Sequence, residues 1–212
     1  MMEISKKKLA ILLSKLRVFD KPDIKAEQYP MDSEIGADVL WNAYQNGDIL
    51  GKVSADLGSG TGILGIGMLI LGTTKTYFVD KDEGALEVAK KNHDNMKSEA
   101  DISGKALFEH REIKDFDKKC DTIVMNPPFG VKVRHQDRAF LDKAFQAADT
   151  IYCFHKSESK GFIDKYSEDN GFKVSHCYDY EFPIKASYHF HSKRIKRVKV
   201  SCSRMINKKV FK

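Results

Sequence analysis

The sequence predicts an α/β protein with a doubly wound, mainly parallel seven-stranded sheet whose last strand is antiparallel. From residue 53 to 170, short apolar runs alternate with segments of helical period, which is typical of strand–helix units. A glycine-rich turn follows the first run, as in nucleotide-binding sheets of this class. No convincing helix separates the last two runs, so that pair is expected to be antiparallel. With 212 residues, one domain with a sizeable core is expected over residues 1–212.

Two helices are predicted before the first strand. Leucines recur at helical spacing between positions 9 and 16, which predicts a helix over residues 5–17. After a polar, aromatic stretch closed by Pro30, Asp32 or Ser33 can cap a second helix that runs to about Asn46. Residues 1–46 are therefore expected to form an N-terminal helical section.

The remaining elements follow from apolar periodicity and from the breakers between the runs. The predicted strands are 53–57, 76–80, 106–108, 122–125, 150–154, 172–182 and 198–202. The predicted helices are 63–71, 83–97, 139–148 and a last one to about residue 170, which Ser157 is expected to cap. Gly171 is suited to end that last helix.

The glycine-rich turn supports two interpretations. Residues 56–62 (DLGSGTG) match the D-x-G-x-G-x-G pattern of S-adenosylmethionine (SAM) methyltransferases, while Gly60, Gly62 and Gly65 match the dinucleotide pattern G-x-G-x-x-G. Because the predicted strand ends at residue 57, the first pattern is in register with the turn. Asp56 suits the positive charges of SAM and would repel a pyrophosphate. Asp80 ends the second strand and can accept hydrogen bonds from ribose hydroxyls in either case.

The segment Met125-Asn126-Pro127-Pro128-Phe129-Gly130 ends the fourth strand, at the edge where open sheets bind ligands. The Asn126 side-chain oxygen and the Pro127 carbonyl can each accept one N–H of an exocyclic amine, which would aim its lone pair at a methyl donor. Phe129 can stack on the base. The alternative is an ordinary turn, because Asn and Pro are common turn residues. His155 and Lys156 after the fifth strand could help to hold the nucleotide or be a plain strand-end pair.

Composition and charge limit the classes of protein. A hydrophobic share of 42% with 31% charged residues excludes a disordered chain. No apolar run approaches a membrane span and no secretory signal is present, so a cytoplasmic protein is expected, or a nuclear one in a eukaryote. The four cysteines lack C-x-x-C spacing and are expected to be buried thiols, with no metal site.

Positive charge is concentrated at the C-terminal end. Residues 184–212 contain ten basic residues and no acidic one, whereas the rest of the chain carries a net charge of −4. Such a section typically meets a polyanion. The segment 188–191 (YHFH) lies among the lysines, a mixture that suits single-stranded RNA but could also be a solvated loop.

Together these motifs resemble a family, the methyltransferase-like ribosomal-RNA N6-adenine methyltransferases of archaea and eukaryotes. The resemblance rests on EQYP, DLGSGTG, VDKD, MNPPFG and ASYHFH, in order along nearly the whole chain. Family members often have Thr at Met31 and Asp at Glu112, and Asp115 could substitute for Glu112. The residues that the motifs and the resemblance together assign to SAM are Gln28, Met31, Asp56, Gly58, Gly60, Thr61, Gly62, Ile63, Asp80, Glu112 and Ile113.

The resemblance implies methylation of adenine N6 in RNA, most often small-subunit ribosomal RNA. Asn126, Pro127, Pro128 and Phe129 would hold the target base, residues 1–46 would include a lid over SAM, and residues 185–212 would contact RNA. It also implies a small zinc-containing adaptor protein as a heterodimer partner, for which the expected edge strand at 106–109 offers a pairing surface. The alternatives are guanine-N2 or protein-glutamine methylation, a nicotinamide-dependent oxidoreductase and a catalytically silent RNA-binding module.

Overall fold

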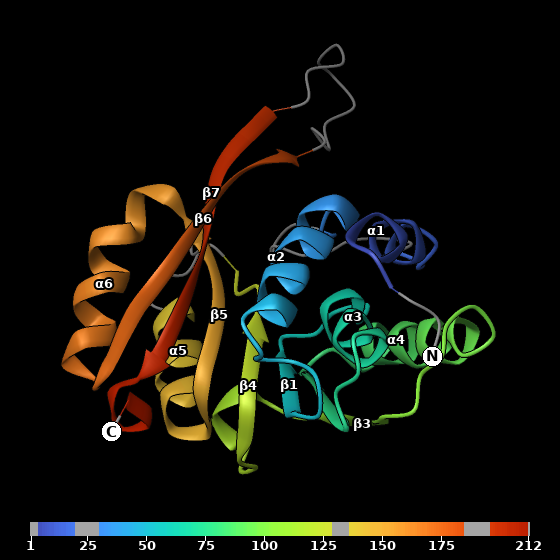
Figure 1. The fold of residues 1–212 in the computed structure, drawn as a ribbon, viewed down its shortest axis with the longest axis horizontal. Coiled ribbons are helices and arrows are strands. Elements are labelled where there is room, and N and C mark those ends of the chain that lie inside the picture. Colours follow the sequence, from blue (N-terminus) through green and yellow to red (C-terminus); the bar gives the residue numbers. More distant parts are fainter. Residues whose placement is uncertain (1–3, 20–29, 129–135, 185–195, 212) are drawn as a thin grey trace.

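The computed structural model describes residues 4–19, 30–128, 136–184 and 196–211 (Figure 1). Its helices are α1 (Lys6–Ser14), α2 (Ser33–Gln45), α3 (Ile63–Ile70), α4 (Glu83–Met96), α5 (Gln136–Ala147) and α6 (Lys160–Asp169). Its strands are β1 (Val53–Leu57), β2 (Lys75–Asp80), β3 (Lys105–His110), β4 (Cys120–Met125), β5 (Ala148–Lys156), β6 (Phe172–Ile184) and β7 (Lys196–Asn207). Short 3₁₀ turns cover Ile113–Asp115, Ser157–Ser159 and Lys208–Phe211.

The seven strands form one sheet in the order β3-β2-β1-β4-β5-β7-β6. The five strands from β3 to β5 are parallel, while β7 is antiparallel to both β5 and β6. The predicted doubly wound, mainly parallel fold with an antiparallel last strand is therefore confirmed. Because β7 lies between β5 and β6, β6 runs in the same direction as β5 and ends at the same edge of the sheet.

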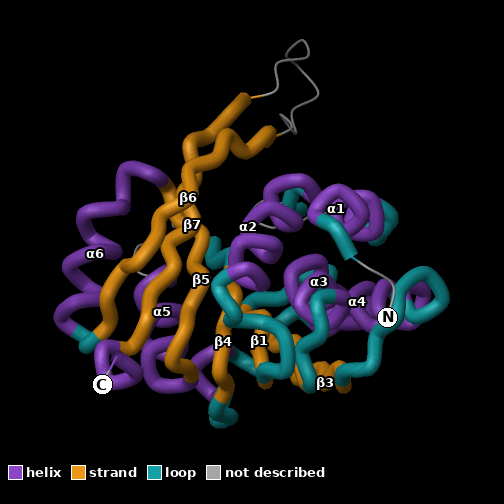
Figure 2. Tube along the Cα trace, viewed as in Figure 1, coloured by secondary structure: helices purple, strands orange, loops and turns teal. Residues whose placement is uncertain are grey.

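Helices cover both faces of this sheet (Figure 2). One core joins α1, α2, α3 and α4 to side chains such as Phe78, Val124 and Tyr152, and a second joins α5 and α6 to Leu57, Ile123 and others on the opposite face. The strand residues alternate between the two cores because successive side chains of a strand point to opposite faces. The parallel strands therefore read as short, nearly continuous apolar runs.

The N-terminal helices pack on the first of these cores. The first was predicted over residues 5–17, but α1 ends at Ser14, whereas the bounds predicted for the second helix agree with α2. The Asp32 side chain caps α2 by accepting hydrogen bonds from the N–H groups of Glu34 and Ile35. The prediction that Ser157 caps the last helix is wrong. Ser157 begins a 3₁₀ turn, and α6 begins only at Lys160. Among the described residues no helix is both long and apolar enough to cross a membrane.

The C-terminal pair β6–β7 extends past the end of β5, since Lys156 at the end of β5 pairs with Val200, four residues inside β7 (Figure 1). Arg197 and Lys199 are exposed on this extension. Arg204 is not: it forms a two-point ion pair with Asp48, at 2.7 and 2.9 Å, with both side chains about nine-tenths buried. Counting Arg204 among the basic residues available to RNA is therefore wrong. The basic and aromatic residues within 185–195 lie outside the described residues.

Candidate active site

The predicted site residues converge at the carboxyl edge of the parallel strands. In the sheet register, Leu57 pairs with Val79 on one side and with Met125 on the other. The glycine loop after β1, Asp80 at the end of β2 and Asn126 after β4 consequently lie beside one another. The segment that follows β3 joins them, because the Arg111 N–H donates to the Asp80 carbonyl at 3.0 Å.

The glycine loop adopts a backbone that only glycine accepts readily. Gly58, Gly60 and Gly62 have φ values of 72°, 51° and 86°, in the left-handed region. The loop leads directly into α3, whose N-terminal position is occupied by Gly62 without a side-chain cap. The first-turn N–H groups of α3 therefore form an electropositive helix end beneath the loop.

The Asp80 carboxylate holds the loop in place. Its Oδ2 accepts the Gly60 N–H at 2.7 Å and its Oδ1 accepts the Asp82 N–H at 2.9 Å. Burial raises the pKa of Asp80, although these backbone hydrogen bonds oppose the shift. Because each carboxylate oxygen has a further lone pair, Asp80 can also accept hydrogen bonds from a ligand.

Asp56 is the most buried acid of the site, at 1% exposure. Its Oδ2 accepts the Gly65 N–H of α3 at 2.7 Å. Burial raises the pKa of Asp56 to about 7; the Gly65 hydrogen bond opposes this shift and the nearby Asp80 adds to it. When they are ionised, Asp56 and Asp80 give the site negative charge, which is suited to a cationic ligand.

Two polar atoms at the site lack hydrogen-bond partners among the described residues. The Ser59 Oγ in the glycine loop and the Asn126 Oδ1 after β4 are both buried and accept or donate no hydrogen bond among the described residues. A buried polar atom without a partner is costly, so a ligand that formed a hydrogen bond with either of these atoms would remove that cost. Pro127 is buried and Pro128 half-buried beside Asn126.

A small cavity of about 20 Å³ lies next to the two prolines and is lined in part by His155, Lys156 and Ser159. Both His155 ring nitrogens have partners: Nδ1 donates to the Lys156 carbonyl at 2.9 Å, and Nε2 lies 2.8 Å from the Ser203 Oγ. Burial lowers the pKa of His155, so the ring is neutral at physiological pH. The structure thus places His155 and Lys156 beside the two prolines.

The other predicted residues are placed as follows. Thr61 is buried in the loop, and Ile63 is half-buried at the start of α3. Glu112 is exposed and Ile113 half-buried, in the segment joined to Asp80. Met31 is 8% exposed and packs in the core beside Gly36. Gln28 and Phe129 lie outside the described residues.

Three residues near the loop were missed by sequence reasoning. A Cβ built on Gly58 would lie 2.9 Å from Phe140 of α5, and one built on Gly60 would lie 3.1 Å from Phe19, so two phenyl rings cover the loop glycines. Asn92 of α4 bonds to the loop at Thr61. The only available signal was for Asn92, a polar residue on the apolar side of a predicted helix.

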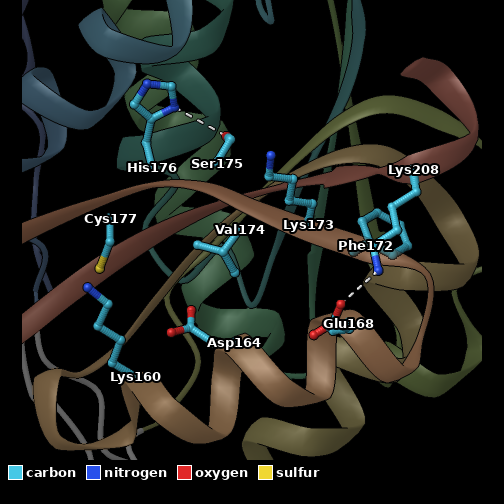
Figure 3. A pocket seen from close by; sticks show the side chains of 10 residues that line it. All are labelled: Lys160, Asp164, Glu168, Phe172, Lys173, Val174, Ser175, His176, Cys177 and Lys208. Atoms are coloured by element: carbon cyan, nitrogen blue, oxygen red, sulfur yellow. Dashed lines mark hydrogen bonds and ion pairs between the residues drawn. The ribbon is translucent and has the colours of Figure 1, made fainter. Parts of the chain in front are cut away.

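A larger cavity, of about 380 Å³, lies between α6 and the first half of β6 (Figure 3). Its lining includes lysines and acids, with Lys208 paired to Glu168 at 3.3 Å. None of the predicted site residues that the structure describes lines it. The first residues of β6 lie at the amino ends of the parallel strands, whereas the glycine loop lies at their carboxyl ends. The chemistry argued from sequence is therefore not located there.

Residues 31–151 match the methyltransferase small domain family. The chain belongs to this family. It is also 31% identical to the Danio rerio rRNA N(6)-adenosine-methyltransferase METTL5, over 89% of this chain and 92% of that protein. An uncharacterized Methanocaldococcus jannaschii protein is 36% identical over 93% of this chain and 92% of its own length. A Pyrococcus horikoshii crystal structure, described as a candidate RNA methyltransferase, has a TM-score of 0.87 at 38% identity, covering 97% and 99% of the two chains.

These matches confirm the resemblance found in the sequence, and with it a SAM-dependent methyltransferase. The geometry fits that cofactor. A loop with three left-handed glycines lies at a helix N-terminus, the buried Asp56 and the half-buried Asp80 offer carboxylates to the sulfonium and ammonium groups, and the Ser59 Oγ is free to bond. The dinucleotide interpretation of the loop is excluded by the family.

Proposed function

We propose that this methyltransferase modifies the N6 amine of an adenosine in ribosomal RNA. The observation that carries the proposal is the buried Asn126 Oδ1, which has no partner among the described residues and lies at the carboxyl end of β4. The relatives named as rRNA N(6)-adenosine-methyltransferases, at 31% and 26% identity over most of the chain, support adenosine as the acceptor. The resemblance favours the small-subunit RNA.

Asn126 and Pro127 would position the acceptor amine. An aryl amine is a poor nucleophile because its lone pair is delocalised into the ring. Accepting its two N–H groups at the Asn126 Oδ1 and the Pro127 carbonyl would hold the nitrogen in a more tetrahedral form, with the lone pair directed outward. Bound SAM supplies a methyl group on a sulfonium, a reactive electrophile. The cofactor would be held by the glycine loop and Asp80, with Glu112 and Ile113 on its adenine side and Gln28 and Met31 at its methionine end.

The cavity beside the prolines supports catalysis by positioning. Among the described residues its lining includes no carboxylate, and burial lowers the pKa of its histidine, which keeps the ring neutral. A strong general base is not required, since the N–H proton becomes acidic only after methyl transfer. The target base must leave its stack to reach Asn126, which costs less for a base that is already unpaired.

The decisive experiment replaces Asn126 with Ala and with Asp. Asn126→Ala removes the acceptor oxygen and is expected to lower methylation by at least about 100-fold, whereas Asn126→Asp keeps an acceptor oxygen and is expected to retain more activity than Ala. The Kd for SAM measured by calorimetry is expected to remain within a few-fold of the wild-type value. A parallel loss of SAM binding and activity would mean that Asn126 belongs to the cofactor site instead.

Mass spectrometry of nucleosides from treated RNA identifies the acceptor. N6-methyladenosine is the expected product. N2-methylguanosine, or methylglutamine in a protein substrate, would replace the proposal by one of the two alternatives within this enzyme class. RNA binding without any methylated product would support the catalytically silent RNA-binding module. Mapping the modified adenosine in ribosomal RNA from cells lacking this protein would name the site.

We further propose that the extended β6–β7 pair and the basic residues after it contact RNA phosphates. Arg197 and Lys199 are exposed where the pair passes the active-site edge, whereas Lys208 and Lys209 follow β7 at the opposite edge. Replacing Arg197 and Lys199 with Ala is expected to lower the salt dependence of RNA binding by roughly 0.7 per lost contact. The matched variant with Lys208 and Lys209 replaced should keep the wild-type slope. If the wild-type protein and both double variants showed the same salt dependence of RNA binding, this would count against RNA contact at the β6–β7 pair.

Lys193 and Arg194, with Tyr188 and Phe190, belong to the same proposal but lie outside the described residues. Loss of the two basic residues should act on the salt slope in the same way as loss of Arg197. Loss of an aromatic residue should instead remove stacking of about 1–3 kcal/mol per base with little change in slope. The comparison separates charge from stacking.

The zinc-containing adaptor is proposed to dock on β3. Among the described residues β3 pairs with β2 alone, and Leu107 on β3 is 38% exposed, an open edge with an apolar side chain. Co-expression with the adaptor should raise yield and melting temperature, and Leu107→Lys should abolish the gain. Ile11→Lys on α1, where the side chain is 50% exposed, is the matched control and should keep it. Equal stability with and without the adaptor would argue against a partner.

A further inference from the structure

A buried asparagine joins the cofactor loop to the chain that follows α1. Asn92 of α4 is 1% exposed, and its side chain makes three hydrogen bonds to main-chain atoms. Its Oδ1 accepts the Arg17 N–H at 2.8 Å, and its Nδ2 donates to the Arg17 carbonyl at 2.9 Å. The same Nδ2 donates its second hydrogen to the Thr61 carbonyl at 2.9 Å.

This arrangement uses the full donor capacity of one amide on two distant segments. An amide that bonds both the N–H and the C=O of one residue imitates a strand neighbour, so it fixes the position of Arg17 in two directions. The third bond ties the same amide to Thr61 in the glycine loop. Burying an asparagine in a helix is unfavourable unless its polar atoms are satisfied, and here they are.

Because Asn92 holds Arg17, it also affects where Phe19 contacts the glycine loop. The described chain continues two residues from Arg17 to Phe19, whose ring lies against Gly60, 3.1 Å from a Cβ built there. Gly60 is also the loop residue whose N–H is held by Asp80. Asn92 thus holds the loop directly at the Thr61 carbonyl, and the segment that it holds places the Phe19 ring against Gly60 of the same loop.

We propose that Asn92 is a positioning residue for SAM, acting by holding segment 17–19 and the Thr61 carbonyl in register on the glycine loop. It touches neither SAM nor the acceptor. Its loss should raise the KM for SAM and leave kcat at saturating SAM nearly unchanged, because the acceptor site after β4 is not involved. The proposal concerns cofactor binding alone and does not depend on which RNA is methylated.

The test compares two variants of Asn92 with two controls in the full-length protein. Asn92→Asp keeps the shape but cannot donate to either carbonyl, and Asn92→Leu removes all three bonds. Asn95→Leu changes an exposed asparagine of the same helix, and Leu86→Ala makes a cavity in the same helix away from these bonds. The measurements are the Kd for SAM by calorimetry, the melting temperature without ligand, and hydrogen exchange at the Arg17 amide.

Both Asn92 variants are expected to weaken SAM binding roughly ten-fold, the effect on an equilibrium constant of about one net hydrogen bond. They should also speed exchange at the Arg17 amide. Leu86→Ala should lower the melting temperature while changing the Kd for SAM less than about two-fold, and Asn95→Leu should change neither. If Leu86→Ala weakens SAM binding as much as the Asn92 variants do, Asn92 has only a structural role and the proposal is overturned.

Phe19→Ala provides a test that is independent of core stability, because Phe19 is half-buried and lies outside any helix. If Asn92 acts by holding Phe19 on the loop, the two effects must overlap. The double variant Asn92→Asp with Phe19→Ala should then bind SAM about as weakly as the weaker single variant. A double variant whose loss equals the product of the two single losses would show that the residues act separately, and would overturn the register mechanism.

Discussion

Asp56→Asn is the substitution whose effect the site geometry defines most sharply. The Asp56 carboxyl is buried and makes one hydrogen bond, from the Gly65 N–H, which an asparagine oxygen can also accept. Burial raises its pKa from 3.8 to about 7. Since the folded protein holds this proton more tightly than the unfolded chain, the carboxyl contributes stability below pH 4 that is lost as the pH rises through 7.

The size of the effect follows from the shift. At 1.36 kcal/mol per pKa unit, the free energy of unfolding should fall by about 2–3 kcal/mol between pH 5 and pH 8 on account of Asp56 alone. An asparagine side chain cannot ionise, so the variant should lack this contribution. The measurement is urea unfolding without ligand at several pH values, and the quantity compared is the difference between the two proteins, in which the other titrating groups cancel. A difference that stays constant from pH 5 to pH 8 would refute an elevated Asp56 pKa.

The same ionisation should appear in cofactor binding. SAM carries a sulfonium charge that favours the ionised Asp56, so its affinity for the wild-type protein should rise as the pH passes 7. The Asp56→Asn variant should show a smaller rise. S-adenosylhomocysteine lacks the sulfonium and should show less difference between the two proteins than SAM does. If both ligands responded alike, Asp56 would not sense the sulfonium charge.

Two further substitutions and one control test the packing of the fold. Asp48→Asn leaves Arg204 buried without its ion-pair partner and should lower the free energy of unfolding by about 3–5 kcal/mol in urea titration; a loss below about 1 kcal/mol would show that solvent reaches the pair. Gly65→Ala brings a Cβ within 2.3 Å of the buried Phe78 ring and should destabilise by about 1–3 kcal/mol. Gly161→Ala meets nothing within 4 Å in helix α6 and should stabilise by about 1 kcal/mol, so the pair distinguishes crowding from helix propensity.

The elements that the sequence predicted well are those with local causes. The strand at 53–57 agrees at both ends, because apolar residues of the strand give way at once to glycines that only a turn requires. The fourth strand was expected from residue 122 and begins at Cys120, where polar neighbours masked its start. The Ser157 cap failed because a capping residue signals a helix start only if the next residues turn as an α-helix, and here a 3₁₀ turn comes first.

Features that depend on partners distant in sequence could not be predicted. Arg204 and Asp48 are 156 positions apart, and nothing local separates Arg204 from the lysines around it. The buried Asn126 Oδ1 shows the reverse case. The motif predicted an acceptor position, and the structure adds that no described residue competes for it. Asn92 joins two segments that lie 75 and 31 positions away, so only the structure relates its amide to the cofactor loop.

The basic C-terminal section shows most clearly how topology decides function. Along the sequence, residues 184–212 form one positively charged block, and the charge count treats its members as equivalent. Because β7 runs antiparallel to β5, the block enters the sheet at the active-site edge and leaves it at the opposite edge. Arg197 and Lys199 are thereby placed on the side of Asn126, Arg204 is buried midway, and Lys208 and Lys209 lie beyond the far end of β5. The basic residues of one run can therefore lie on different sides of the protein. Which of them could share a polyanion-binding surface is known only once the direction of the strand is known.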